Sequence, residues 1–198
     1  MTAEREPVTE LPRNTVVAYQ GGGYDGCFWE WNYAFIDKDG NFHDIFSSGY
    51  KGIKDAEGLL EALNEDKEID TYDMGDEEER QRMCDSESVR NSLGIANWFA
   101  AHPELEVKVT LKCDRCGERV EPEGCQADGF HGCGGIEIAA DRIICPECYS
   151  MYSCWYCGEY TSGELTGEVT KEDGTTIELH GDACEWCAGD IKDGRREV

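Results

Sequence analysis

At 198 residues the chain can form one large domain or two small ones, and its 39 % hydrophobic residues suffice for one modest core. Its 43 acidic and 18 basic side chains give a formal net charge of −25, with both halves acidic. Binding to a phosphate backbone draws on clustered Lys and Arg, which the sequence lacks, so this charge favours a solvated surface, an adaptation to high salt or a basic protein partner over direct contact with nucleic acid.

The N-terminal residues are charged and contain no apolar stretch, so they predict no signal peptide. No window approaches the roughly 18 apolar residues of a membrane span. In a chain without an export signal, twelve cysteines indicate metal binding in a reducing compartment and not disulfides. We therefore expect a cytoplasmic protein, with residues 1–11 as a flexible tail.

Alternating hydrophobicity predicts strands at the start of an α+β domain over residues 12–111. Residues 16–19 form a short strand candidate, followed by a glycine break. Residues 27–36 alternate over ten positions, and the turn signal at 37–41 leads into a returning strand over 42–46. The two longer segments are expected to pair as a β-hairpin.

Two helices are expected after this hairpin. Asp55 is placed to cap the first, which carries three leucines, and Ser86 is placed to cap the second, which ends near His102. Between them, residues 61–79 hold ten carboxylates and one lysine and predict a loop that leads into a helix start. Residues 105–111 alternate and predict a strand. The expected N-terminal domain is thus a small antiparallel sheet with two helices.

The C-terminal half carries four Cys-x-x-Cys pairs. A two-residue gap lets one tight turn present two sulfurs to the same ion, and two such turns supply the four thiolates that Zn²⁺ prefers in closed structural sites. We therefore predict two structural zinc ions, with no open coordination position for catalysis. The expected ligands are Cys113, Cys116, Cys145, Cys148, Cys154, Cys157, Cys184 and Cys187.

An internal repeat indicates how these pairs combine. Cys-x-x-Cys-Gly-Glu begins at Cys113 and again at Cys154, and in each case a hairpin-sized insert and a second Cys-x-x-Cys follow. Two copies of one unit favour sequential pairing, although interleaved pairing, as in cross-braced fingers, stays open. The expected organisation is a first zinc unit at residues 112–150, a second at 151–190 and a tail at 191–198.

The two units resemble tandem treble-clef or zinc-ribbon fingers, and their close succession resembles a LIM domain. The resemblance covers about 75 residues and implies an architecture, not an activity. LIM modules usually have a shorter spacer than the five residues between Cys148 and Cys154. The first site also resembles a rubredoxin site, which implies iron there as an alternative. Residues 21–33 are similar to small phage-borne proteins of unknown role, and this likeness implies no activity.

The remaining candidates are weaker. Cys27 follows a glycine-rich run and His43 lies across the expected hairpin, a combination that could supply a thiol nucleophile and its base. Cys27 is also in register with aromatic residues, where a small core residue would sit, so packing is the competing interpretation. Cys125, His131 and Cys133 could form part of a third site or replace a ligand in the first, but they lack a paired turn, so packing and loop positions are the competing interpretation. No role is assigned to Cys84.

The sequence therefore predicts a non-enzymatic, acidic zinc protein that binds a protein with a basic surface. That partner class includes nucleic-acid-binding proteins, with DNA mimicry as the extreme case and a phage-encoded modulator of a host protein as an example. One alternative is a hydrolase or transferase that depends on Cys27. The other is a zinc ribbon that contacts nucleic acid through local cations, namely Lys112, Arg115, Arg119 and Arg142.

Overall fold

Mixed α and β elements make up two compact units in the computed structural model of the chain. The structure describes residues 7–22, 29–46, 53–64, 69–131, 137–161 and 163–198, in which there are five α-helices and several small antiparallel sheets. Unit 1 comprises Met1–Leu111 with Glu121–Glu123, and unit 2 comprises Lys112–Val120 with Gly124–Val198.

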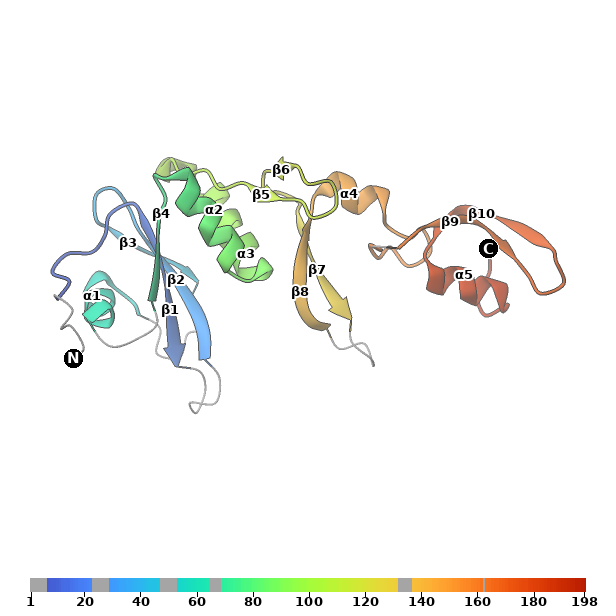
Figure 1. Cartoon of the computed structure of the whole chain (residues 1–198), viewed down its shortest axis with the longest axis horizontal. Helices are drawn as coiled ribbons and strands as arrows, with labels where there is room; N and C mark the ends of the chain where they lie inside the picture. Colours follow the sequence, from blue (N-terminus) through green and yellow to red (C-terminus); the bar gives the residue numbers. More distant parts are fainter. Residues whose placement is uncertain (1–6, 23–28, 47–52, 65–68, 132–136, 162) are drawn as a thin grey trace. The chain divides into compact units, whose positions relative to one another are not determined.

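A four-stranded antiparallel sheet organises unit 1 (Figure 1). Its strand order is β3-β2-β1-β4, with the longer strands β1 and β2 in the centre. The predicted hairpin is confirmed, because Ile36 pairs with Phe42 across β2 and β3. The strands are β1 (Thr15–Gly22), β2 (Trp29–Ile36), β3 (Phe42–Phe46) and β4 (Ile69–Asp73).

Helices cover both faces of this sheet. They are α1 (Ala56–Asn64), α2 (Glu77–Ser86) and α3 (Val89–Ala101). On one face, Leu59 of α1 shares a buried cluster with Val17. On the other, Phe99 of α3 meets Phe35 edge-on, with 5.0 Å between ring centroids. Because successive strand residues point to opposite faces, the two helical layers bury every residue from 32 to 36.

The acidic segment over residues 61–79 is not a loop, so that expectation is wrong. It contains the end of α1, all of β4, which pairs antiparallel with β1, and the start of α2. Asp76 caps α2 by accepting a hydrogen bond from the Glu78 N–H at 2.9 Å. Helix α2 is therefore a third helix of this unit, beyond the two expected.

Two further expectations for unit 1 are wrong at their boundaries. Ser86 ends α2, and the cap of α3 is Ser88, whose hydroxyl accepts from the Asn91 N–H. The segment 105–111 is not a strand over its length, because a 3-10 turn, η2 (Pro103–Leu105), precedes it and Glu106 adopts a left-handed conformation with φ 56°. Only Leu111–Lys112 pairs, as β5.

Unit 2 contains one arrangement twice: a cysteine turn, a β-hairpin and a short helix. We call residues 113–151 the first module and residues 154–192 the second module. The first module has β6 (Arg119–Val120), which pairs with β5, then β7 (Gln126–His131), β8 (Glu137–Ile144) and α4 (Pro146–Met151). The second has β9 (Thr166–Thr170), β10 (Thr176–Ala183) and α5 (Glu185–Lys192).

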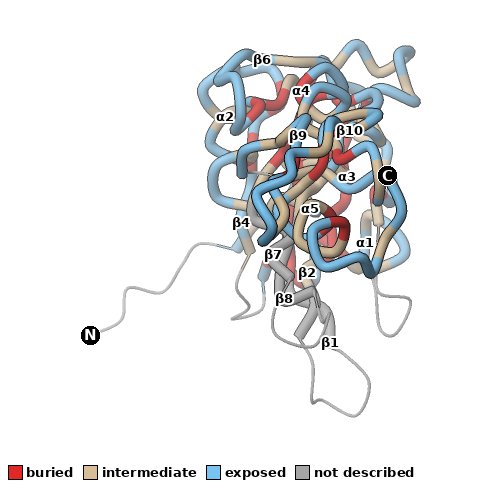
Figure 2. The backbone as a smooth tube through the Cα atoms, turned by 90° about the vertical axis from the view of Figure 1, so that its right-hand side faces the viewer, coloured by how far each residue is buried: buried red, intermediate tan, exposed pale blue. Residues whose placement is uncertain are grey.

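Figure 2 marks the buried positions along the backbone, and the residues at these positions differ between the two units. Unit 1 has a core of large side chains, including five fully enclosed aromatic residues, namely Tyr19, Tyr33, Phe35, Tyr72 and Phe99. In unit 2, cysteines supply about half of the described buried hydrophobic residues, and the largest others are isoleucines such as Ile144. Unit 2 therefore has little apolar core of its own, and an additional source of stability is needed. None of the described helices has the length and apolar character to span a membrane.

Candidate metal centres

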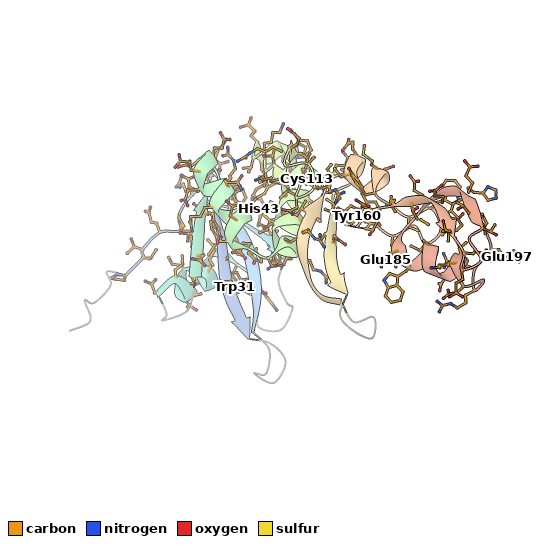
Figure 3. The ribbon with its side chains drawn as sticks, turned by 45° about the vertical axis from the view of Figure 1, so that its right-hand side comes forward. Trp31, His43, Cys113, Tyr160, Glu185 and Glu197 are labelled. Carbon is orange, nitrogen blue, oxygen red and sulfur yellow. The ribbon has the colours of Figure 1, made fainter. Side chains whose placement is uncertain are left out.

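Among the described residues, two groups of four cysteines come together, one in each module. Within each group the Sγ atoms all lie within 4.8 Å of one another. The first site is formed by Cys113, Cys116, Cys145 and Cys148, and the second site by Cys154, Cys157, Cys184 and Cys187. These are the sets that sequential pairing of the Cys-x-x-Cys turns predicts. The structure therefore differs from the interleaved alternative. Cys113 of the first site is labelled in Figure 3.

The sulfur spacing fits a tetrahedral ion. A tetrahedron with Zn–S bonds of about 2.3 Å has edges of about 3.8 Å, and the Sγ atoms of Cys157 and Cys184 are 4.0 Å apart. Four thiolates from two turns would close the coordination sphere, so an ion here would be structural and would offer no position for a substrate. The donor set therefore fits zinc, and it also fits the iron of a rubredoxin-like site.

A tight turn with a glycine presents the first two sulfurs of each site. The Gly117 N–H donates to the Cys113 carbonyl at 2.8 Å, and the Gly158 N–H donates to the Cys154 carbonyl at the same distance. These glycines have φ values of 78° and 73°, which lie in the left-handed region. A Cβ at either position would meet nothing within 4 Å, so the backbone conformation, and not a lack of space, requires glycine.

The other two sulfurs of each site lie at the start of a helix. Cys145 is the N-cap residue of α4 and Cys184 is that of α5. Their backbone N–H groups donate to Sγ of Cys113 and of Cys154, at 3.3 Å in both cases. The helix start and the cysteine turn are thus joined through a thiol sulfur in the same way in both modules.

The protonation of these thiols shows what the sites need. Burial raises the pKa of Cys113 and of Cys154. Backbone N–H groups that donate to each sulfur outweigh this effect and lower the pKa of both thiols to about 6. Burial and the neighbouring cysteines raise the pKa of Cys148 to about 12 and also raise that of Cys187. One thiolate therefore forms readily in each site, whereas deprotonation of Cys148 and of Cys187 requires a cation to offset the charge of the neighbouring sulfurs.

An arginine donates a hydrogen bond to a ligand sulfur of the second site. The described contacts of the first site include no such bond. Nη1 of Arg196 donates to Sγ of Cys187 at 3.1 Å and to the Tyr156 carbonyl at 2.9 Å. Sequence reasoning missed this residue, because it lies in the segment expected as a C-terminal tail. No motif marks it, and only its position shortly after the last predicted ligand could have suggested it.

The sequence also did not reveal how the modules are joined. The Arg115 guanidinium lies over the Tyr152 ring, 3.9 Å from its centroid. Tyr149 of α4 stacks with Tyr160 at 5.9 Å between ring centroids, and the Thr161 N–H donates to the Tyr152 carbonyl at 2.9 Å. The five-residue spacer is therefore held by aromatic and backbone contacts within unit 2.

Several weaker candidates are not brought into either site. Cys27 and Cys133 lie outside the described residues, as does the side chain of His131. Cys84 is on α2, in the other unit. Cys125 is buried near the first site but is not in its group of four sulfurs; burial and then the charges of Cys145 and Cys113 raise its pKa to about 11.

His43 is placed by the hairpin turn. Its Nε2 is 2.9 Å from Oδ2 of Asp37. The ring also lies near those of Phe35 and Trp98, at 6.0 and 6.1 Å between centroids. A turn carboxylate and two aromatic rings account for the position of this histidine, and its relation to Cys27 lies outside the described residues.

The four cations proposed as a nucleic-acid contact lie in the first module or at its edge. Lys112 and Arg119 are exposed on β5 and β6. Arg142 is ion-paired with Asp128 at 3.4 Å, while Arg115 lies over an aromatic ring. Two of the four cations thus have partners within the module, which weakens the case for a shared phosphate-binding surface.

Comparisons of the chain with protein-family models, with curated proteins and with solved structures find no match. The likenesses to LIM domains and to phage-borne proteins are therefore without support from a related protein, and the two cysteine sites are the firmest functional feature of this chain.

Proposed function

We propose that both sites hold structural zinc and that the modules are treble-clef-like fingers. Each module presents two cysteines on a tight turn and two at a helix start, with a β-hairpin between them. Coordination would stabilise a unit in which cysteines make up about half of the described buried hydrophobic residues. The observation that carries the proposal is the convergence of four sulfurs within 4.8 Å at each site.

We further propose that the protein is a non-enzymatic binding protein whose partner has a basic surface. Unit 2 contains 17 acidic and 8 basic side chains, a net charge of −9, and each four-thiolate zinc site would add about −2. Such a surface attracts cationic partners by long-range steering. A nucleic-acid-binding protein is one such partner, and a reducing cytoplasm is the compartment that keeps the thiols available.

Elemental analysis of the purified protein tests the metal proposal. We expect two zinc ions per chain, and one ion per chain in each of Cys148→Ser and Cys187→Ser. Cys84→Ser is the matched control and should retain two, because this cysteine lies in the other unit. A wild-type protein without bound transition metal would overturn the proposal, and iron in the first site would correct the metal assignment.

Binding measurements test the partner proposal. A lysine- and arginine-rich peptide should bind at low salt, and its association rate should fall several-fold as the ionic strength rises to about 0.15 M. An acidic peptide of equal length is the control. Failure of the basic peptide to bind at low salt would contradict the proposed function.

A further inference from the structure

The two modules carry different residues at equivalent positions beside their sites. The repeat places Trp155 in the second module where Asp114 stands in the first, 41 positions earlier. It likewise places Trp186 where Glu147 stands, 39 positions earlier. The first module therefore serves as an internal reference, since it builds the same cysteine site with charged residues at both positions.

Both tryptophans are exposed to solvent. The exposed fraction of Trp155 is 71 % and that of Trp186 is 85 %. At the equivalent position in the first module, Oδ2 of Asp114 accepts a hydrogen bond from the Ile143 N–H at 2.6 Å. A carboxylate thus satisfies the fold at this position, and an exposed indole ring there is not required for building the site.

The structure makes room for one of these rings. A Cβ added to Gly181 would lie 2.6 Å from Cγ of Trp155, so the Trp155 ring rests against the backbone of β10. The equivalent position in the first module is Arg142, which has a side chain. The second module therefore pairs a glycine with the tryptophan and holds its ring in place while most of the ring surface stays exposed.

A carboxylate accompanies the two tryptophans, which lie in the two turns that bring together the sulfurs of the second site. Glu185, labelled in Figure 3, is exposed at the start of α5 and directly precedes Trp186. We name Trp155, Glu185 and Trp186 the tryptophan surface. It offers flat aromatic faces and negative charge, the two features that hold an ammonium or guanidinium group.

We propose that the tryptophan surface is a docking site for a protein segment that carries Lys or Arg. This inference rests on the proposed function and deepens it by assigning the contact to the second module. Cation–π contacts and aromatic burial supply affinity here, and the Glu185 carboxylate and the −9 charge of unit 2 select for cations. Exposed tryptophans also stack on single-stranded bases, but this acidic surrounding opposes a phosphate backbone.

The test replaces each tryptophan by the residue that the first module carries. The variants are Trp155→Asp and Trp186→Glu, and Glu147→Gln in the first module is the matched control. The probe is a fluorescently labelled peptide of alternating Arg, Lys and Gly, titrated with the zinc-loaded full chain, and zinc content is measured for every variant. Trp186→Glu alone remains informative if Trp155→Asp fails to fold.

We expect each tryptophan variant to weaken peptide binding about tenfold and the control to change it less than twofold. The variants add negative charge, so a surface that acted through charge alone would bind the basic peptide more tightly after substitution. Unchanged or tighter binding would therefore overturn the inference and leave the proposed function standing. Absence of binding by the wild type would instead refute the proposed function. A single-stranded oligonucleotide that binds the wild type and not the variants would also overturn the inference.

Discussion

Nη1 of Arg196 donates a hydrogen bond to Sγ of Cys187, at 3.1 Å. The same nitrogen donates to the Tyr156 carbonyl, between the first two cysteines of the second site. The last residues of the chain thus contact both cysteine pairs of that site. An adjacent cation stabilises thiolate charge, and groups that hydrogen-bond to metal ligands affect metal affinity by about 10- to 100-fold.

Arg196→Gln should therefore weaken zinc retention at the second site by about tenfold while leaving the first site unchanged. Competition with a chromogenic chelator measures the release of zinc. In Arg196→Gln we expect one ion per chain to be released quickly and the other slowly. Arg195→Gln is the matched control, because Arg195 pairs only with exposed carboxylates in its described contacts, Asp190 and Asp193. Equal release rates in both variants would show that the sulfur contact has no effect.

We expect replacement by alanine to have opposite effects on stability at Gly158 and at Gly189. Gly158 has φ 73° and Gly189 lies inside α5, while an added Cβ meets nothing within 4 Å at either. Gly158→Ala should cost about 1 kcal/mol through the left-handed backbone, whereas Gly189→Ala should stabilise α5 by up to about 1 kcal/mol. Urea unfolding of the zinc-loaded protein measures both. A shift in the same direction would contradict the backbone explanation.

Asp37 holds the turn between β2 and β3. Its Oδ1 accepts from the N–H groups of Asp39 and Asn41, and its Oδ2 accepts from the Asn41 amide and contacts His43. Burial alone would raise the pKa of Asp37, but these hydrogen bonds lower it well below its usual range. Asp37→Asn should cost about 1 kcal/mol at pH 7, with Asp39→Asn as a near-neutral control.

The sign of the pH dependence follows from the lowered pKa of Asp37. The carboxylate contributes its full stability above the unfolded pKa of about 3.9 and loses it as the pH falls below that value. The stability difference between wild type and Asp37→Asn should therefore shrink below about pH 4. Chemical denaturation at pH 7 and pH 3 gives the comparison. A difference that grew on acidification would refute the assigned role.

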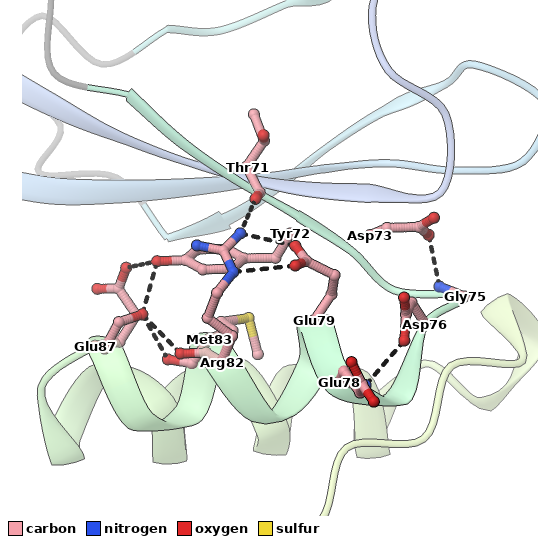
Figure 4. A network of polar contacts seen from close by, with 11 residues as sticks. Thr71, Tyr72, Asp73, Gly75, Asp76, Glu78, Glu79, Arg82, Met83 and Glu87 are labelled. Atoms are coloured by element: carbon pink, nitrogen blue, oxygen red, sulfur yellow. Dashed lines mark hydrogen bonds and ion pairs between the residues drawn. The ribbon is translucent and has the colours of Figure 1, made fainter.

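Glu87 joins the α2–α3 junction to the sheet through Tyr33 and Tyr72, and Figure 4 shows its contact with Tyr72. Oε2 accepts from the Tyr33 hydroxyl, and Oε1 accepts from the Tyr72 hydroxyl at 2.8 Å. Both tyrosines are almost fully buried, so Glu87→Ala would leave their hydroxyls without this acceptor. We expect a loss of about 2–3 kcal/mol in the free energy of unfolding, against less than about 0.5 kcal/mol for Asp85→Ala on the exposed side of α2.

The same network predicts an alkaline limit. Burial and then contact with Glu87 raise the pKa of Tyr33, and burial leads among the causes that raise the pKa of Tyr72 to about 12. A raised tyrosine pKa gives stability that is present below the unfolded pKa of about 10 and is lost as the pH rises towards the folded value. Absorbance titration of the folded protein should show at least two tyrosines that ionise only above about pH 11, and ionisation of all nine near pH 10 would contradict this.

Much of the site and part of the fold followed from the sequence itself. Cys-x-x-Cys spacing is a local constraint, since two residues of a tight turn bring their sulfurs together wherever the chain lies. The repeat then favoured sequential pairing of these turns, and the structure has those combinations. The hairpin over β2 and β3 was also predictable, because alternation and turn residues act over neighbouring positions.

Tertiary contacts decided the rest. Strand β4 carries two carboxylates among its five residues and becomes a strand because β1 offers it backbone partners. Residues 106–110, in contrast, alternate well and stay outside a sheet. Strand hydrogen bonds join segments far apart in the chain, so local alternation does not determine them. For the same reason, the sequence did not predict the contact of Arg196 with Cys187 or that of Gly181 with Trp155, which depend on the tertiary fold. Local geometry in the sequence specified the ligands, and packing between distant segments specified their surroundings.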